Sequence, residues 1–389
     1  MLDAFDVTLL SLVLAYLMRD LGLSRESGGL LGTLTLAFSA AGGLAFGILA
    51  DRIGRARSLS LSILIYSFAT AACGLSTTFT MLIVFRMIVG LGMGGEWTTG
   101  AALIAETWPA EHRGKALGLM QSTWAIGEMI AAGVAGLLLP RFGWRAVFFV
   151  GVLPALLVFW IRRKVPEPEL WTKQVGEREG RRQRSAAGGL RLLWRKDIRW
   201  NGLIATTMNA FGMFGYWGLF YWIPAYLSLP LNQGGRGLNI GKTTAWLIVM
   251  GAGKWLGYTC FGFFADSAGR RKSYVAYLLA AAVLAPLYGW VHSPMWLLLL
   301  GPFVAFFGTG FFSGYSAIAA ELFPTEIRAT AMGLSYNIGR GVSALAPIAV
   351  GALSYRVGLG NSFWLMGAAF LVSAMFAVML PETKGKELE

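Results

Sequence analysis

Apolar segments of about 20 residues, separated by short breaks rich in glycine, proline or charge, follow one another along the whole chain. A segment of that length crosses a bilayer core about 30 Å thick, and it must be helical there because its peptide groups find no water. The pattern predicts an all-α membrane protein with twelve transmembrane helices. The predicted helices cover residues 1–18, 29–50, 59–75, 80–107, 114–139, 144–162, 198–229, 243–265, 273–291, 295–322, 329–356 and 361–380.

The composition agrees with a surface that faces lipid. Of the 389 residues, 56% are hydrophobic and 14% are charged, and the mean hydropathy is +0.59, which excludes an ordinary water-soluble domain. The net charge of +13 does not indicate a nucleic-acid partner, because Lys and Arg lie in short runs between apolar segments. Cys73 and Cys260 lie in apolar helical sequence, so we expect packed thiols.

The distribution of basic residues predicts the orientation of the chain. The segment 162–199 contains twelve basic and five acidic residues, and basic residues accumulate on the cytoplasmic side of a membrane. We expect a multi-pass monomer in the inner (plasma) membrane, in contact with lipid, with both termini cytoplasmic. Asp3 and Asp6 stand where a cleaved signal would be basic, so the first helix is expected to be retained, although its short length is also compatible with a truncated start.

Two different motifs occur twice, each at the same spacing. GILADRIGRAR begins at residue 47 and GFFADSAGRRK at 262, whereas ETWPAEHRG begins at 106 and ELFPTEIRA at 321. Both pairs are offset by 215 residues, which indicates a six-helix unit duplicated in tandem. We therefore predict an N-terminal bundle over 1–162, a basic cytoplasmic linker over 163–197 and a C-terminal bundle over 198–389.

The first of these motifs resembles the signature between helices 2 and 3 of the major facilitator superfamily. The resemblance extends over the whole chain and implies the fold of that family, with two pseudo-symmetric six-helix bundles. Basic residues in the motif can pair with acids at the ends of neighbouring helices, which favours a latch for one conformation over a substrate site. The residues assigned to this latch are Gly47, Asp51, Arg52, Arg55, Glu106, Arg113, Asp266, Arg270, Glu321 and Arg328.

A second motif narrows the resemblance. The run from Arg86 to Glu96, which contains four glycines, is similar to helix 4 of sugar porters and of proton-coupled organic-acid symporters. Gln121 matches a sugar-contacting position, but Thr207 and Met208 replace the paired glutamines of helix 7, and the tryptophan of helix 10 is absent. One match against two absences favours the lactate, sialate or aromatic-acid branches.

Two cations are predicted near the middle of the membrane. Lys254 and Arg340 each lie about 11 residues into a predicted helix, a depth of roughly 16 Å. Buried charge is costly, and transporter sites lie near the midplane, so these cations predict a small organic anion as substrate. In the alternative interpretation, Glu96 or Glu128 neutralises them. The predicted substrate-binding residues are Arg340, Lys254, Asn337, Gln121, Glu128, Trp124 and Tyr216.

Asp6 resembles the helix 1 aspartate that carries the coupled proton in acid and sugar symporters, and Arg86 occupies the helix 4 position that pairs with it. Protonation of such a carboxylate releases the arginine, which makes the pair a proton-linked switch. A static ion pair between the two helices is the alternative. Asp3 is the less favoured carrier. The proton gradient is then the energy source, with no cofactor.

The leading hypothesis is therefore proton symport of a small organic anion (a monocarboxylate, sialate or aromatic acid) by alternating access. The alternatives are a proton-coupled efflux antiporter of amphipathic or cationic compounds, or a sugar-type symporter. An enzyme is not expected, because the chain has only two histidines, His112 and His292, and shows no nucleophile, metal or phosphate motif.

Overall fold

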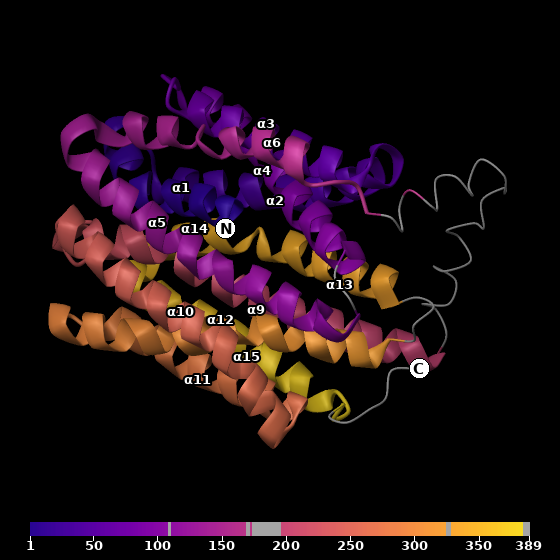
Figure 1. Ribbon diagram of the computed structural model, residues 1–389. Coiled ribbons are helices and arrows are strands. Elements are labelled where there is room, and N and C mark those ends of the chain that lie inside the picture. Colours follow the sequence, from indigo (N-terminus) through magenta and orange to yellow (C-terminus); the bar gives the residue numbers. More distant parts are fainter. Residues whose placement is uncertain (108–109, 169–171, 173–195, 324–327, 384–389) are drawn as a thin grey trace. The chain divides into compact units, whose positions relative to one another are not determined.

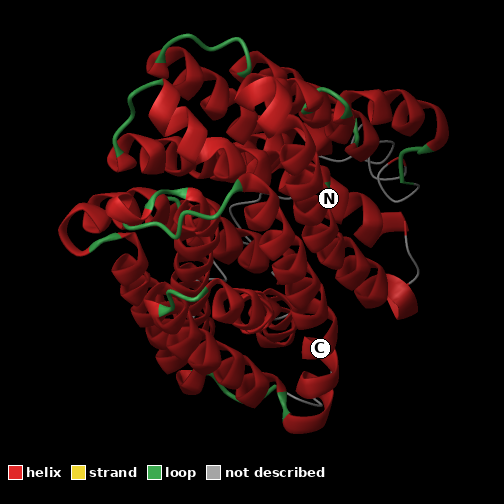
Figure 2. Ribbon diagram, turned by 90° about the vertical axis from the view of Figure 1, so that its left-hand side faces the viewer, coloured by secondary structure: helices red, strands yellow, loops and turns green. Residues whose placement is uncertain are grey.

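The computed structural model describes residues 1–107, 110–168, 172, 196–323 and 328–383. Within these ranges every regular element is a helix (Figure 2). The chain divides into two compact units, Met1–Gln183 and Arg184–Glu389, here called the first and second unit. The helices carry the labels of Figure 1. The predicted linker 163–197 lies largely outside the described residues and stays a prediction.

The first unit contains six helices by continuous backbone hydrogen bonding: α1 (Leu2–Asp20), α2 (Arg25–Ile53), α3 (Arg55–Cys73), α4 (Phe79–Thr107), α5 (Ala110–Val150) and α6 (Pro154–Lys164). Helix α5 bends at Gly143, whose φ of 72° is left-handed, and this bend falls where the fifth predicted helix gives way to the sixth. The sixth predicted helix is not continuous, because a turn at 151–153 separates it from α6, which begins at Pro154.

The second unit contains seven α-helices and one short 3₁₀ turn: α9 (Lys196–Ser228), η1 (Leu231–Gln233), α10 (Ile240–Ala268), α11 (Arg270–Trp290), α12 (Pro294–Leu322), α13 (Arg328–Ser343), α14 (Ala346–Val357) and α15 (Leu359–Met379). The prediction of one helix over 329–356 is wrong, because the chain turns at residues 344–345. Pro347 explains the break, since proline has no N–H to continue a helix and starts one readily. Arg340 consequently lies in the last turn of α13.

The predicted loop at 51–58 shrinks to a single residue. Helix α2 ends at Ile53 and α3 begins at Arg55, with only Gly54 between them at a φ of 107°. Gly269 separates α10 from α11 in the same way, at a φ of 108°. Only glycine adopts this conformation without strain, so the repeated motif places its basic residues on the first turn of a helix.

Nine stretches of the described residues are long and apolar enough to cross a membrane. One of them, 119–164, contains both the fifth and the sixth predicted helices. Helices α1 and α9 are not among the nine. Helix α1 carries Asp3 and Asp6, and α9 is rich in Trp and Tyr, which prefer the membrane interface. Large apolar side chains such as Phe263 and Leu137 are more than 70% exposed, as expected of helices that face lipid.

Close helix contacts repeat with the same offset as the motifs. A Cβ on Gly42 in α2 would overlap the carbonyl oxygen of Leu91 in α4, and a Cβ on Gly257 in α10 would overlap that of Phe306 in α12. The two glycines, like the two carbonyls, are 215 residues apart. Small residues of this kind let membrane helices pack closely, so the duplication preserved a packing contact together with the motifs.

Candidate functional site

The first latch joins three helix ends in the first unit. Arg55, the first residue of α3, donates from Nε to both carboxylate oxygens of Glu106 at 3.1 Å and from Nη2 to Oε1 at 2.8 Å. Its Nη1 donates to the Ala50 carbonyl at 2.9 Å. The sequence interpretation paired these basic and acidic residues, and the structure brings Arg55 and Glu106 together. The fork of a guanidinium holds a carboxylate in a fixed orientation, so α3 is fastened to α4.

A glutamate that the sequence interpretation left out completes this latch. The carboxylate of Glu167 accepts the backbone N–H groups of Ala56 at 3.1 Å and Arg57 at 3.0 Å. These are among the first N–H groups of α3, which have no partner inside the helix and attract negative charge. A side chain at Gly54 would collide with this carboxylate, so the glycine is required by the contact as well as by its backbone angle.

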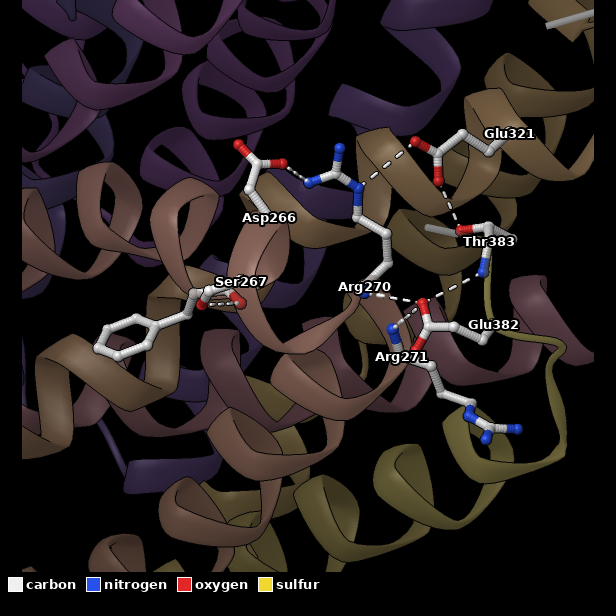
Figure 3. Close-up of polar contacts among 8 residues, drawn as sticks. Asp266, Ser267, Arg270, Arg271, Glu321, Glu382 and Thr383 are labelled. Carbon is white, nitrogen blue, oxygen red and sulfur yellow. Dashed lines mark hydrogen bonds and ion pairs between the residues drawn. The ribbon is translucent and has the colours of Figure 1, made fainter. Parts of the chain in front are cut away.

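The second latch has the same plan (Figure 3). Arg270 pairs with Asp266 one turn earlier, and its Nε donates to Glu321 Oε1 at 3.4 Å. Thr383 Oγ1 donates to the other oxygen of Glu321 at 2.5 Å. The contact between Arg270 and Glu321 is single and long, whereas the equivalent contact in the first unit is bidentate, so the second latch holds its helices through more partners.

Glu382 caps α11 as Glu167 caps α3. Its Oε1 accepts the backbone N–H of Arg270 at 2.8 Å and of Arg271 at 3.3 Å (Figure 3). The two glutamates are 215 residues apart, each following a proline, at 166–167 and 381–382. This third pair with the shared offset is the signal in the sequence that identifies them.

Several residues assigned to the latches take no part in these contacts. Gly47 faces Thr98 at an ordinary packing distance, and Arg52 is exposed, with no hydrogen bond or ion pair to the other described residues. The side chains of Asp51, Arg113 and Arg328 lie outside the described residues. Their assignment stays a prediction.

We expect Glu167→Gln to loosen the first turn of α3, because a neutral amide accepts the two N–H groups more weakly than a carboxylate does. Hydrogen–deuterium exchange of the backbone amides of residues 56–58 should accelerate on the order of ten-fold, the effect of losing one charged hydrogen bond. The exposed Glu26, in the first turn of α2, gives the control Glu26→Gln. Equal exchange in both variants would mean that the Glu167 cap contributes no stability.

Asp6 and Arg86 are fully buried in the first unit, but they do not touch. Thr70 Oγ1 donates to Asp6 Oδ2 at 3.1 Å, and Arg86 Nε donates to Thr35 Oγ1 at 3.2 Å. Asp6 Oδ1 and both terminal nitrogens of Arg86 have no hydrogen-bond partner among the described residues. The expected direct ion pair, dynamic or static, is therefore wrong for this conformation, because a threonine from α3 or α2 takes part of each group's hydrogen bonding.

The aromatic and polar residues predicted on α5 lie around a cavity of the first unit. This cavity has a volume of about 220 Å³, and Gln121 and Trp124 line it. Trp97 Nε1 donates to Gln121 Oε1 at 3.5 Å. Trp124 Nε1 donates to Glu128 Oε1 at 2.9 Å, which leaves Glu128 beside the cavity but not in its lining.

The predicted cations of the second unit are both buried, at 4% exposure each. The Lys254 ammonium lies 3.9 Å from the ring centroid of Phe220 and 5.1 Å from that of Tyr216, so the faces of two aromatic rings stabilise its charge. Arg340 forms no ion pair with the described residues of its unit. The Asn337 amide donates to the Gly333 carbonyl at 2.9 Å, so one of its two N–H groups is already used within α13.

Asn209 of α9 is a further buried polar residue next to α13. It is fully buried, its Oδ1 has no hydrogen-bond partner among the described residues, and its amide nitrogen would collide with a Cβ at Gly339. Gly339 precedes Arg340, so Asn209 packs against the segment that carries the cation. Sequence reasoning passed over it because a lone Asn in an apolar helix carries no pattern.

Embedded charges are divided between the two units. In the described helices, away from their ends, the second unit contributes cations and the first unit contributes carboxylates with one arginine. The cations of the second unit are Lys254 and Arg340, and the charged residues of the first are Asp3, Asp6, Glu96, Glu128 and Arg86.

Comparison with known proteins agrees with this architecture. A family model described as Major Facilitator Superfamily matches residues 1–259 and 235–389. A putative metabolite transport protein of Haemophilus influenzae is 35% identical over 100% of this chain and 95% of its own length. The cis,cis-muconate transport protein of Acinetobacter baylyi is 32% identical over 99% of this chain and 92% of its own. A crystal structure of a D-xylose-proton symporter shares the fold, with a TM-score of 0.79 at 20% identity over 100% of this chain and 97% of that one.

Proposed function

The chain belongs to the major facilitator superfamily, and from this premise we propose that it carries a small organic anion through the membrane together with protons. It is a multi-pass membrane transporter and not an enzyme. The proposal places it in the inner (plasma) membrane with both termini cytoplasmic, where the basic segment 162–199 would lie.

The observation that carries the proposal is the burial of two cations in the second unit. A buried charge is costly unless an opposite charge or a hydrogen-bonded ligand accompanies it. The carboxylates of Asp266 and Glu321 lie at helix ends of this unit, where Arg270 engages both. An anionic ligand at Arg340 and Lys254 would supply the missing counter-charge. The names of relatives support this class, since one is a cis,cis-muconate and another a sialic acid transporter.

The carboxylates of the first unit suit the proton half of the reaction. Asp6 is fully buried, keeps one oxygen without a hydrogen-bond partner, and lies within electrostatic range of Arg86. A proton added to this carboxylate removes its charge and weakens its hold on the arginine, which favours a different packing of the helices. Alternating access couples the two events when proton and anion favour the same conformation.

Uptake by the purified protein in liposomes tests the proposal. Labelled lactate, benzoate, N-acetylneuraminate and cis,cis-muconate are offered in turn, with an acidic exterior imposed. We expect at least one anion to accumulate, and to stop accumulating when a protonophore dissipates the gradient. Transport of none of these, together with proton-driven movement of a lipophilic cation, would support the efflux antiporter instead.

A further inference from the structure

The cavity of the first unit has a polar wall and an apolar wall. Five helices contribute to it: α1, α3, α4, α5 and α6. Asp3 of α1 and Glu96 of α4 bring two carboxylates to the lining, beside the amide of Gln121. The α6 side is formed by Leu157, Trp160 and Ile161, so the cavity lies inside one bundle. No residue of the second unit lines it.

Asp6 has no direct access to this cavity. It is fully buried and is not part of the cavity lining, and its Oδ1 has no hydrogen-bond partner among the described residues. Asp3 precedes it by three residues on the same helix, so both side chains share a face about 4.5 Å apart along the axis. A proton on Asp6 is therefore one helical turn from a carboxylate that does line the cavity.

Glu96 stands opposite this face. Its Oε2 is buried and has no hydrogen-bond partner among the described residues, and the same holds for the Tyr66 hydroxyl from α3. Glu96 interacts electrostatically with Asp3, with Asp6 and with Tyr66. A carboxylate only accepts hydrogen bonds, whereas a carboxylic acid also donates one, so a proton on Glu96 can be passed to a neighbouring carboxylate.

The charges around this group favour mobile protons. Three carboxylates, those of Asp3, Asp6 and Glu96, face the cations of Arg86 and of the Met1 ammonium, which lies 3.4 Å from Asp3 Oδ1. Tyr66 adds no charge, and α5 brings only the neutral Gln121 and Trp124 to the lining. An excess of negative charge inside a membrane protein is costly, and binding a proton removes it without any movement of the backbone.

We propose that this cavity is the proton port of the first unit, and that Glu96 and Asp3 relay protons between its water and Asp6. In one direction the Asp6 carboxyl becomes a carboxylate, Asp3 or Glu96 takes up the proton, and a water in the cavity carries it away. No other bond changes. The proposal rests on the proposed function only in that Asp6 is the coupling residue, and it separates the proton route from the anion-binding cations.

Infrared spectroscopy of the purified protein tests the relay without any substrate. The C=O stretch of a protonated carboxyl shifts when its proton is exchanged for deuterium, and the band missing in Asp6→Asn identifies Asp6. After a switch from H₂O to D₂O, the Asp6 band should shift about ten-fold or more slowly in Glu96→Gln than in the wild type, as for a barrier raised by about 1.4 kcal/mol. Glu26→Gln should exchange at the wild-type rate.

A second variant blocks the port and leaves every carboxylate in place. Gly100 lines the cavity, and a Cβ there would meet no atom within 4 Å, so Gly100→Leu fills space without a clash at its first carbon. Gly133 of α5 has the same open surroundings but does not line the cavity, which makes Gly133→Leu the matched control. We expect slow exchange of the Asp6 band only in Gly100→Leu.

Wild-type exchange rates in both Glu96→Gln and Gly100→Leu would overturn the port, and so would the absence of any carboxyl band that Asp6→Asn removes. Slow exchange in Gly133→Leu as well would show a general effect on the bundle and would also refute it. None of these results bears on anion binding by the second unit, so the port and the proposed transport function fail separately.

Discussion

Asp6→Asn is expected to abolish proton-driven accumulation of the anion while leaving anion exchange intact. The neutral amide has nearly the shape of a protonated carboxyl, so the carrier should still change conformation with anion bound on each side. It can no longer take up or release the coupled proton, so the inside concentration should rise only to the outside value. Proteoliposomes measure both modes, with net uptake under an imposed pH gradient and counterflow without one.

The matched control for this prediction is Asp20→Asn. Asp20 lies at the other end of α1, where its Oδ2 accepts the Trp144 indole N–H at 3.0 Å, and it should keep accumulation because it is not buried with Asp6. Accumulation at the wild-type level by Asp6→Asn would remove Asp6 from the coupling role. Loss of counterflow as well would show that the amide disturbs the bundle, and Asp6→Glu would then decide whether an acid is needed.

The latches show how far the sequence could lead and where it stopped. Arg55 and Glu106 could be paired in advance because two motifs repeat with one offset, which fixes both as equivalent positions of a duplicated unit. The same offset relates Glu167 to Glu382, but a short Pro-Glu pair is too common to stand out before the helix starts it caps are known. Cap geometry depends on where α3 and α11 begin, and a predicted loop hid that boundary.

The buried charges were harder to place than to find. Hydropathy alone marked Asp6 and Arg86, because charge inside an apolar segment is conspicuous. Their partners Thr35 and Thr70 were not found, since threonine is common in apolar helices and its hydroxyl gives no periodic signal. The direct contact expected between the two charges depends on side-chain packing among four helices, which no local pattern records.

The same limit applies to the second unit. The depth of Lys254 and Arg340 followed from the rise of a helix, and burial of both agrees with it. The break at 344–345 was visible as Pro347 but was read as part of one span. It matters for function, because the last turn of a helix has carbonyl groups without partners, and a cation such as Arg340 is stabilised there until an anion arrives.

Arg340 is expected to be the main ligand for the carboxylate of the substrate. Its planar guanidinium can donate to both oxygens at once, whereas Lys254 acts as a second point charge resting on aromatic rings. Arg340→Lys should therefore weaken binding by about 1 to 3 kcal/mol, the range of a charged hydrogen bond, and Arg340→Ala should weaken it further. Calorimetry with an anion identified by uptake gives these affinities, on protein first shown to be monodisperse.

Arg356 supplies the matched control, because it is exposed on α14 and Arg356→Ala removes the same charge from the same unit without touching the buried cations. Its affinity should equal that of the wild type. Lys254→Ala should weaken binding less than Arg340→Ala, since a monodentate ammonium loses one contact where the guanidinium loses two. Unchanged affinity in both Arg340→Ala and Lys254→Ala would show that the two cations serve the structure of the unit, with Glu96 or Glu128 as their counter-charges, and the assignment of an anionic substrate would have to be withdrawn.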